Sequence, residues 1–231
     1  MIFRQLFERE SSTYTYLIAC EHSRQAALID SVKSEVPKYL QLLEELGLTL
    51  AYALDTHTHA DHITGAGALR EATGCITLLG DEAGSACISQ GLHDGDLIQI
   101  GQLQLKAIYT PGHTDDSYSY LLEDSGQNYV FTGDTLLIRG TGRTDFQNGN
   151  AHDQYHSLFD KLLTLPDHTW VYPGHDYKGW SQSSIAEEKA HNPRLQVKDI
   201  NAYVELMNNL KLPTPQLMDI AVPANRACGN N

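Results

Sequence analysis

Hydrophobic and polar residues alternate along the first thirty residues of the chain, as they do in strands that bury one face. Three such segments, separated by polar turns, predict an antiparallel meander over residues 2–7, 14–20 and 26–30. From Ser34 the apolar residues recur at helical spacing, up to a glycine at position 47 that suits the end of a helix. An apolar run over residues 50–55 then predicts a buried strand.

Strands dominate the middle of the chain and helices its last quarter. Short apolar runs between turns predict strands over residues 75–79, 97–100, 103–109, 118–122, 129–132 and 170–172. Helical spacing predicts helices over 81–90, 152–163, 184–190 and 198–210, followed by a Pro-rich tail.

The length of 231 residues, 41% of them hydrophobic, predicts one large domain over residues 1–231. Acidic residues outnumber basic ones by 29 to 16, and this net charge of -13 disfavours nucleic acid or an anionic membrane as a partner. The cysteines form no CxxC pair, so we expect free thiols at Cys20, Cys75, Cys87 and Cys228. The chain starts with charges too early for a secretory signal and has no run of roughly 20 apolar residues, so we expect a soluble cytoplasmic protein.

Three histidines and an aspartate share one turn between the strand over 50–55 and a short helix over 65–74. They form the pattern HxHxDH, with the members His57, His59, Asp61 and His62. Imidazole and carboxylate groups bind zinc and ferrous iron, and a turn can direct several of them at one point. A solvated loop has no need of three histidines within six residues, so we interpret this turn as part of a metal site.

Three more candidate ligands follow the ends of other predicted strands. His113 and His175 each come after a Pro-Gly pair, and Asp134 comes after a glycine. Side chains at the ends of strands in a rigid sheet can converge on one point. Each of these turns alone is common in loops without any ligand role, but together with HxHxDH they predict one metal site.

A glycine-rich loop over residues 136–147 carries two arginines, Arg139 and Arg143. The loop lacks the GxxxxGK[ST] order of a phosphate-binding loop. An arginine beside a metal suits recognition of a carboxylate-bearing substrate, although Arg139 could equally be structural.

Motifs along nearly the whole chain resemble those of the metallo-β-lactamase superfamily: THxHxDH at 56–62, PGHT at 111–114, TGD at 132–134 and YPGH at 172–175. Within it, the chain resembles the persulfide dioxygenases, also called sulfur dioxygenases, through residues 60–65, 137–147, 175–177 and 221–225. This likeness implies an α+β fold, the αββα sandwich of two mixed β-sheets flanked by helices. A C-terminal helical segment and tail, about 184–231, would complete the substrate pocket. The family often has Pro-Gly where this chain has Asp115 and Asp116, which leaves the shape of that loop open.

The seven candidate ligands allow two arrangements. A two-metal site would place His57, His59 and His113 on one metal, Asp61, His62 and His175 on the other, and Asp134 between them, as in hydrolases. The resemblance instead implies one Fe(II) per chain, bound by His57, His113 and Asp134. The other four groups would then orient these ligands through hydrogen bonds. Two histidines and one carboxylate leave coordination positions open for O2 and a substrate sulfur.

The resemblance implies an oxidoreductase of sulfur metabolism and hydrogen sulfide detoxification, which oxidises glutathione persulfide with O2 and water to sulfite and glutathione. Arg143, Tyr177 and Arg194 would bind the carboxylates and backbone of glutathione; simple solvation of the arginines is the alternative. Cys228 could exchange sulfur with a persulfide, although a free thiol in the tail is the simpler interpretation. Family members are often dimers, so we expect a homodimer.

Two other functions stay open at this point. The first is a dinuclear-metal hydrolase of glutathione thioesters similar to glyoxalase II, which usually carries a longer helical C-terminal region. The second is a non-catalytic binding scaffold of the same fold. The scaffold is disfavoured because such proteins typically lose ligands, and this sequence has all seven.

Overall fold

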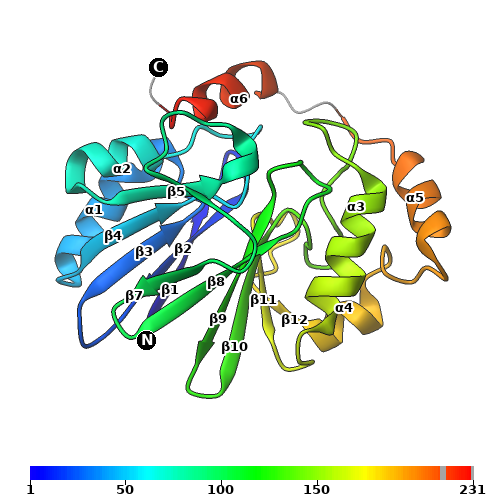
Figure 1. Cartoon of the computed structure of the whole chain (residues 1–231), viewed down its shortest axis with the longest axis horizontal. Helices are drawn as coiled ribbons and strands as arrows, with labels where there is room; N and C mark the ends of the chain where they lie inside the picture. The colour runs from blue at the N-terminus through cyan, green and yellow to red at the C-terminus, as the bar shows by residue number, and fades with distance from the viewer. Residues whose placement is uncertain (214–216, 230–231) are drawn as a thin grey trace.

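Two six-stranded sheets lie face to face between outer helices in the computed structural model, which describes residues 1–213 and 217–229 (Figure 1). The first sheet contains, in spatial order, β1 (Ile2–Glu8), β2 (Thr13–Ala19), β3 (Gln25–Ile29), β4 (Thr49–Leu54), β5 (Ile76–Gly80) and β6 (Gln90–Leu92). The second contains β12 (Ser183–Ser184), β11 (Trp170–Pro173), β10 (Gln127–Gly133), β9 (Tyr118–Asp124), β8 (Leu103–Tyr109) and β7 (Leu97–Ile100). Both sheets combine parallel and antiparallel pairs.

Helices cover the outer faces of both sheets. The first sheet is covered by α1 (Val36–Glu45) and α2 (Ala66–Thr73), and the second by α3 (Ala151–His156), α4 (Ile185–His191) and α5 (Ile200–Asn208), whereas α6 (Met218–Arg226) lies across one end of the sandwich (Figure 1). Two 3-10 turns, Lys33–Glu35 and Asp81–Ala83, and the π and 3-10 turns that extend α3, Ser157–Lys161 and Leu162–Thr164, complete the helical elements. None of the helices in the described part of the chain has the length and apolar character needed to cross a membrane.

Strand β2 shows why the sequence folds into four layers. All seven of its residues are buried. Successive side chains of a strand point to opposite faces, so Tyr16 and Ile18 enter the core between the sheets while Leu17 and Ala19 pack toward α1 and α2. A third core between the second sheet and its helices contains Val130, Leu158 and Tyr203. The expected αββα sandwich is therefore confirmed.

Residues 81–90 do not form the predicted helix. The helical part ends at Ala83, because Gly84 adopts a φ of +59° that stops the turn. Beyond it the chain bonds to the edge of the first sheet, where the Ser89 amide donates to the Thr77 carbonyl at 3.0 Å, and continues as β6. The Pro-rich tail also differs from expectation, since residues 218–226 form α6 with Pro223 inside it.

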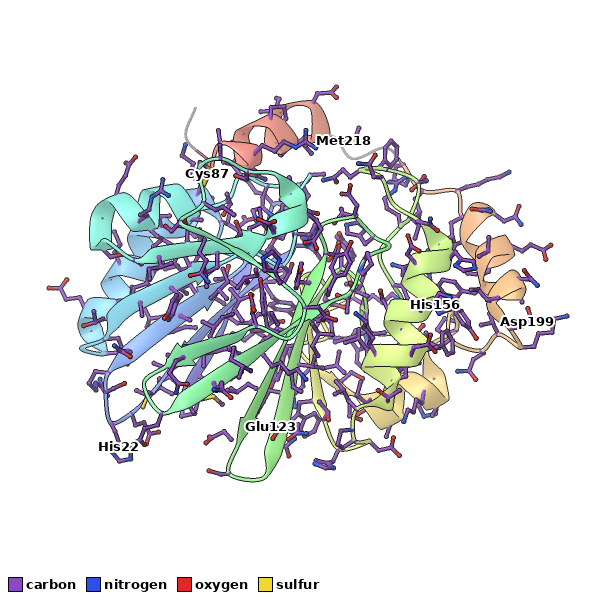
Figure 2. The ribbon with its side chains drawn as sticks, in the orientation of Figure 1. His22, Cys87, Glu123, His156, Asp199 and Met218 are labelled. Atoms are coloured by element: carbon purple, nitrogen blue, oxygen red, sulfur yellow. A yellow bond between two sulfur atoms is a disulfide. The ribbon has the colours of Figure 1, made fainter. Side chains whose placement is uncertain are left out.

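Two of the four cysteines are not free, which corrects the prediction from the sequence. Cys87 and Cys228 form a disulfide between positions 141 residues apart, beside the end of α6 (Figure 2). No local spacing indicates such a pair, because the fold alone brings the tail against the loop before β6. Cys20 and Cys75 are free and buried.

Candidate metal centre

The candidate ligands lie at one edge of the sandwich because four strands end there. Strands β8 and β10 are both antiparallel to β9, and β11 is parallel to β10, so these three point the same way. His113, Asp134 and His175 follow their ends. The HxHxDH turn follows β4 of the other sheet and is joined to this edge by a 2.7 Å hydrogen bond from the Tyr118 amide to the Thr56 carbonyl.

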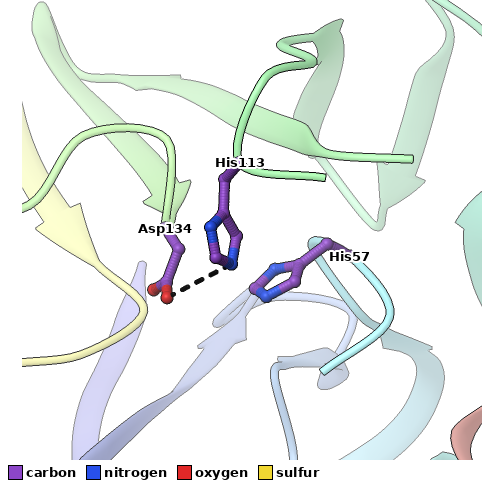
Figure 3. A group of neighbouring side chains, drawn as sticks. All are labelled: His57, His113 and Asp134. Carbon is purple, nitrogen blue, oxygen red and sulfur yellow. Dashed lines mark ion pairs between the residues drawn. The ribbon is translucent and has the colours of Figure 1, made fainter. Parts of the chain in front are cut away.

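His57, His113 and Asp134 form one group, in which one ligand atom from each lies within 4.8 Å of the others (Figure 3). His113 Nε2 is 3.6 Å from Asp134 Oδ2, and the two imidazole rings meet edge to face with centroids 4.9 Å apart. The chain thus brings together the three residues that the sequence analysis assigned to iron.

Hydrogen bonds fix the imidazole of His113. Its Nδ1 lies 2.8 Å from the Arg143 carbonyl, which can only accept, so Nδ1 carries the proton and Nε2 keeps its lone pair on the side of Asp134. The Nδ1 of His57 lies 2.9 Å from the Thr56 hydroxyl.

His59, Asp61 and His175 form a second group with the same mutual spacing. His175 Nε2 lies 3.5 Å from Asp61 and 3.7 Å from Asp134, so the two groups adjoin. His62 stands outside both groups, with its Nδ1 3.0 Å from Asp61.

The electrostatics of these histidines differ. Burial lowers the pKa of His57 and of His59 well below the ordinary value, and the neighbouring imidazoles lower it further, so both rings stay neutral. Burial also acts to lower the pKa of His175, but the carboxylates of Asp134 and Asp61 outweigh it and raise this pKa to about 9. Burial acts to raise the pKa of Asp61, yet His175 and His62 hold it well below its usual range.

Three polar atoms indicate that a cation belongs here. His59 Nδ1, His62 Nε2 and Asp134 Oδ1 are buried and have no hydrogen-bond partner among the described residues. Buried polar atoms are normally paired, so Asp134 Oδ1 favours a cation at the first group, whereas the lone pairs of His59 and His62 are ones that the two-metal arrangement would use. The donor set therefore fits a metal.

Glycines allow the loops to approach the ligands closely. A Cβ at position 142 would lie 2.7 Å from His113 Nδ1 and would overlap the carbonyl oxygen of Asp134. A Cβ at Gly174 would lie 2.9 Å from Asp134 Oδ1. Gly142 lies within the glycine-rich loop, but its close approach to His113 and Asp134 is not predictable from the sequence pattern.

Two buried carboxylates also escaped prediction. Asp30, just after β3, accepts hydrogen bonds from the Thr56 amide at 2.7 Å and the Thr56 hydroxyl at 3.0 Å, and contacts His59 Nε2 at 3.1 Å. Asp116 accepts from the Thr58 amide at 3.0 Å and from the Thr114 hydroxyl at 2.5 Å. Asp116 thereby connects the His113 loop to the HxHxDH turn. The signal in the sequence for Asp30 was an acidic residue directly after a buried strand.

A pocket of about 500 Å³ opens beside the first group and is also lined by Arg143, Tyr177 and Arg194. Arg194 donates to the carbonyl and the hydroxyl of Thr141, and among the described residues it has no carboxylate partner. Arg143 already forms a two-pronged ion pair with Asp145 at 2.6 and 2.8 Å. The ring of Tyr177 stacks on His175 with centroids 6.0 Å apart, and 71% of this residue is exposed.

Arg139 has a structural role at the rim of the pocket. Its guanidinium pairs with the fully buried Glu188 and, at 2.9 Å, with Glu187. The Ser183 hydroxyl and the Asn192 amide also donate to Glu188, at 2.6 and 2.8 Å. Arg139 therefore anchors the glycine-rich loop to α4.

Comparisons with known proteins agree with this geometry. The family model of the metallo-β-lactamase superfamily matches residues 9–175. The human mitochondrial persulfide dioxygenase ETHE1 is 46% identical over 230 residues, which span 99% of this chain and 89% of that protein. The crystal structure of ETHE1 from Myxococcus xanthus is 57% identical, covers both chains completely and has a TM-score of 0.96. A probable hydroxyacylglutathione hydrolase of Schizosaccharomyces pombe is 36% identical over 85% of this chain and 74% of its own length.

Proposed function

The chain belongs to the persulfide dioxygenases of the metallo-β-lactamase superfamily, and from this premise we propose that it uses one Fe(II) to oxidise glutathione persulfide with O2 and water to sulfite and glutathione. The observation that carries the proposal is the group of His57, His113 and Asp134 facing a pocket lined by Arg194, which has no carboxylate partner among the described residues. A role in sulfur metabolism and in removal of hydrogen sulfide is proposed on the same ground.

His57, His113 and Asp134 would hold the iron, and the donor set supports this choice, since two histidines and one carboxylate are typical of non-haem Fe(II) oxygenases. When bound, the Fe(II) supplies open coordination positions and the electrons for oxygen chemistry. His113 is held in the correct tautomer by the Arg143 carbonyl, and His59 is held by Asp30. His59, Asp61, His62 and His175 thus have a role in orienting the centre.

Arg194 would bind a carboxylate of glutathione, because its half-buried guanidinium lacks an anionic partner among the described residues. Tyr177 offers an exposed ring at the pocket, and Arg143 is the weaker candidate, since Asp145 already neutralises it. Positioning the persulfide and excluding water are the contributions of this pocket to the reaction.

We further propose that residues 1–231 form one domain and that the segment of about 184–231 completes the substrate pocket. Arg194, Leu212 and Pro213 line the pocket and support this, whereas residues 214–216 and 230–231 lie outside the described part of the chain. A cytoplasmic location and a homodimer also stay predictions. The mammalian relatives are named as mitochondrial, so fractionation of cells that produce this chain is the appropriate test.

A two-metal thioester hydrolase is the second candidate, because His59, Asp61 and His175 stand within ligand distance of one another. Family membership and the nearly complete coverage of the persulfide dioxygenases favour the one-iron proposal over it.

Oxygen uptake by anaerobically purified protein, started with glutathione persulfide, is the decisive measurement. We expect persulfide-dependent uptake and about one iron per chain, the single-ion stoichiometry of a two-histidine, one-carboxylate site. Thioester hydrolysis without oxygen uptake, or two zinc ions per chain, would refute the proposal.

The Asp134→Ala variant should lose both iron and activity, whereas the matched His62→Ala variant should keep much of its iron and lose activity in part. Equal loss of iron in the two variants would show that the ligands are wrongly assigned.

A further inference from the structure

A single side chain from the end of the chain satisfies three backbone groups of the HxHxDH turn. The Asn225 amide nitrogen donates to the carbonyl oxygens of His59 and His62, each at 2.8 Å. Its side-chain oxygen accepts from the Thr64 amide, also at 2.8 Å. Asn225 is buried and lies 161 to 166 positions beyond these partners, so α6 holds the turn from outside the two sheets.

The helix that carries Asn225, α6, packs only weakly against the rest of the protein through apolar side chains. Its buried side chains besides Asn225 are the small Ala221 and Ala224, whereas Ile220 is 62% exposed. Small buried side chains contribute little hydrophobic stabilisation, since that scales with the apolar area removed from water. Contacts other than apolar packing therefore keep α6 in place.

The disulfide between Cys87 and Cys228 supplies that attachment three residues after Asn225. Hydrogen bonds accompany it: the Ser85 hydroxyl donates to the Arg226 carbonyl at 2.9 Å, the Gly67 amide donates to the Cys228 carbonyl at 3.0 Å, and the Lys33 ammonium donates to the Gly229 carbonyl. The covalent bond thus joins the loop before β6, the end of α6 and, through Asn225, the metal-binding turn.

We propose that Asn225 is a positioning residue for the HxHxDH turn and that the Cys87–Cys228 disulfide is a thiol-sensitive lock that keeps it there. Reduction of the disulfide frees the end of α6, loosens the turn and shortens the time for which the chain retains its metal. The proposal concerns metal retention, so it holds whichever substrate the site takes.

The chemistry is thiol–disulfide exchange with two equivalents of a low-molecular-weight thiol. The first thiolate attacks Cys87, which is partly exposed whereas Cys228 is buried, and forms a mixed disulfide while the Cys228 thiolate leaves. The second thiolate attacks the small-molecule sulfur, releases the Cys87 thiolate and carries away the oxidised small disulfide. Both protein thiolates take a proton, and the two small thiols supply the two electrons. If the proposed function is correct, its product glutathione is such a thiol.

The test measures how fast metal passes from the loaded protein to a chelator, with and without prior treatment with reduced glutathione under anaerobic conditions. Hydrogen exchange of the Thr64 amide in metal-free protein is the second measurement, because it reports the turn without depending on activity. We expect reduction to speed both processes about tenfold or more, the effect of losing one or two ordinary hydrogen bonds.

Variants distinguish the effect of the Cys87–Cys228 disulfide from a general destabilisation of the protein. Cys87→Ser should behave as reduced protein and no longer respond to glutathione. Cys75→Ser is the matched control, because Cys75 is a free thiol whose pKa is raised by burial, and it should respond as the unaltered chain does. Asn225→Ala should release metal quickly and exchange the Thr64 amide quickly in both redox states. Asn225→Asp keeps the acceptor for the Thr64 amide, so it should restore protection of that amide from exchange but not the slow metal release.

Equal metal release and equal exchange before and after reduction would overturn the proposal. Titration of four free thiols in the untreated protein would overturn it as well. Persulfide-dependent oxygen uptake is measured separately and tests the proposed function independently of the disulfide.

Discussion

Replacement of Arg194 by alanine tests the most specific feature of the pocket, a guanidinium that meets no carboxylate in the part of the chain that the structure describes. Arg194 donates only to Thr141 and, among the described residues, has no carboxylate partner. Burial lowers its pKa, as expected for a partly desolvated cation. A substrate carboxylate would complete this site.

The size of the effect follows from the kind of bond that is lost. A hydrogen bond to a charged group contributes about 1.5–3 kcal/mol. At 1.4 kcal/mol for each factor of ten, Arg194→Ala should therefore raise the KM for glutathione persulfide roughly 10- to 150-fold, with a smaller change in kcat. Arg143→Ala should cost less than about 1 kcal/mol, because the exposed Asp145 already competes for that guanidinium.

Steady-state oxygen uptake with glutathione persulfide and with the persulfide of esterified glutathione provides the assay. Esterification removes the carboxylates, so it should weaken binding to the unaltered enzyme and leave the KM of Arg194→Ala nearly unchanged. Arg9→Ala, which removes an exposed arginine that does not line the pocket, controls for net charge. An unchanged KM in Arg194→Ala, or equal sensitivity of both enzymes to esterification, would refute the reasoning.

Three further changes test the supports of the site. Gly142→Ala should lose most bound metal by elemental analysis, because its methyl group would overlap two of the proposed ligand residues, whereas Gly140→Ala, with 3.9 Å of clearance, should keep it. Arg139→Ala should lower the free energy of unfolding in urea by about 3–5 kcal/mol, since Glu188 is then buried without its cation. A serine hydroxyl and backbone amides lower the pKa of Cys20 to about 6, which stabilises the fold above pH 9 and is lost as the pH falls through 6. Cys20→Ser should therefore flatten the dependence of unfolding free energy on pH between 6 and 9.

The sequence was sufficient to predict which candidate ligands come together, because each follows a strand that the pattern of apolar residues predicts. Strand direction then brings the ends of β4, β8, β10 and β11 to one edge, so local patterns predict a long-range cluster. The same patterns predicted most strands and helices, whereas the arrangement of the strands in two sheets was implied by the family resemblance. They failed over residues 81–90, where hydrogen bonds offered by the edge of β5 outweighed a weak helical tendency.

The supports of the site were harder to predict because they act across the fold. Asn225 and the partner of Cys87 lie in the tail, and no spacing along the chain relates them to the HxHxDH turn. Asp116 was noticed only as a departure from the family, yet its carboxylate binds the amide of Thr58. Contacts of this kind depend on how loops pack, which residue periodicity does not encode.

Asp30 and Asn225 hold the same turn from two sides, and this arrangement predicts that their effects are not additive. Asp30 binds the ring of His59, and Asn225 binds its carbonyl. If both bonds restrain one turn, the first substitution already releases it and the second has less left to remove. The double variant Asp30→Asn, Asn225→Ala should thus lose less unfolding free energy than the sum of the single variants, by about 0.5 kcal/mol or more. Urea denaturation of the metal-free proteins gives all four values. If the loss of unfolding free energy in the double variant equals the sum of the two single losses within about 0.3 kcal/mol, Asp30 and Asn225 make two independent local contacts and do not restrain one turn together.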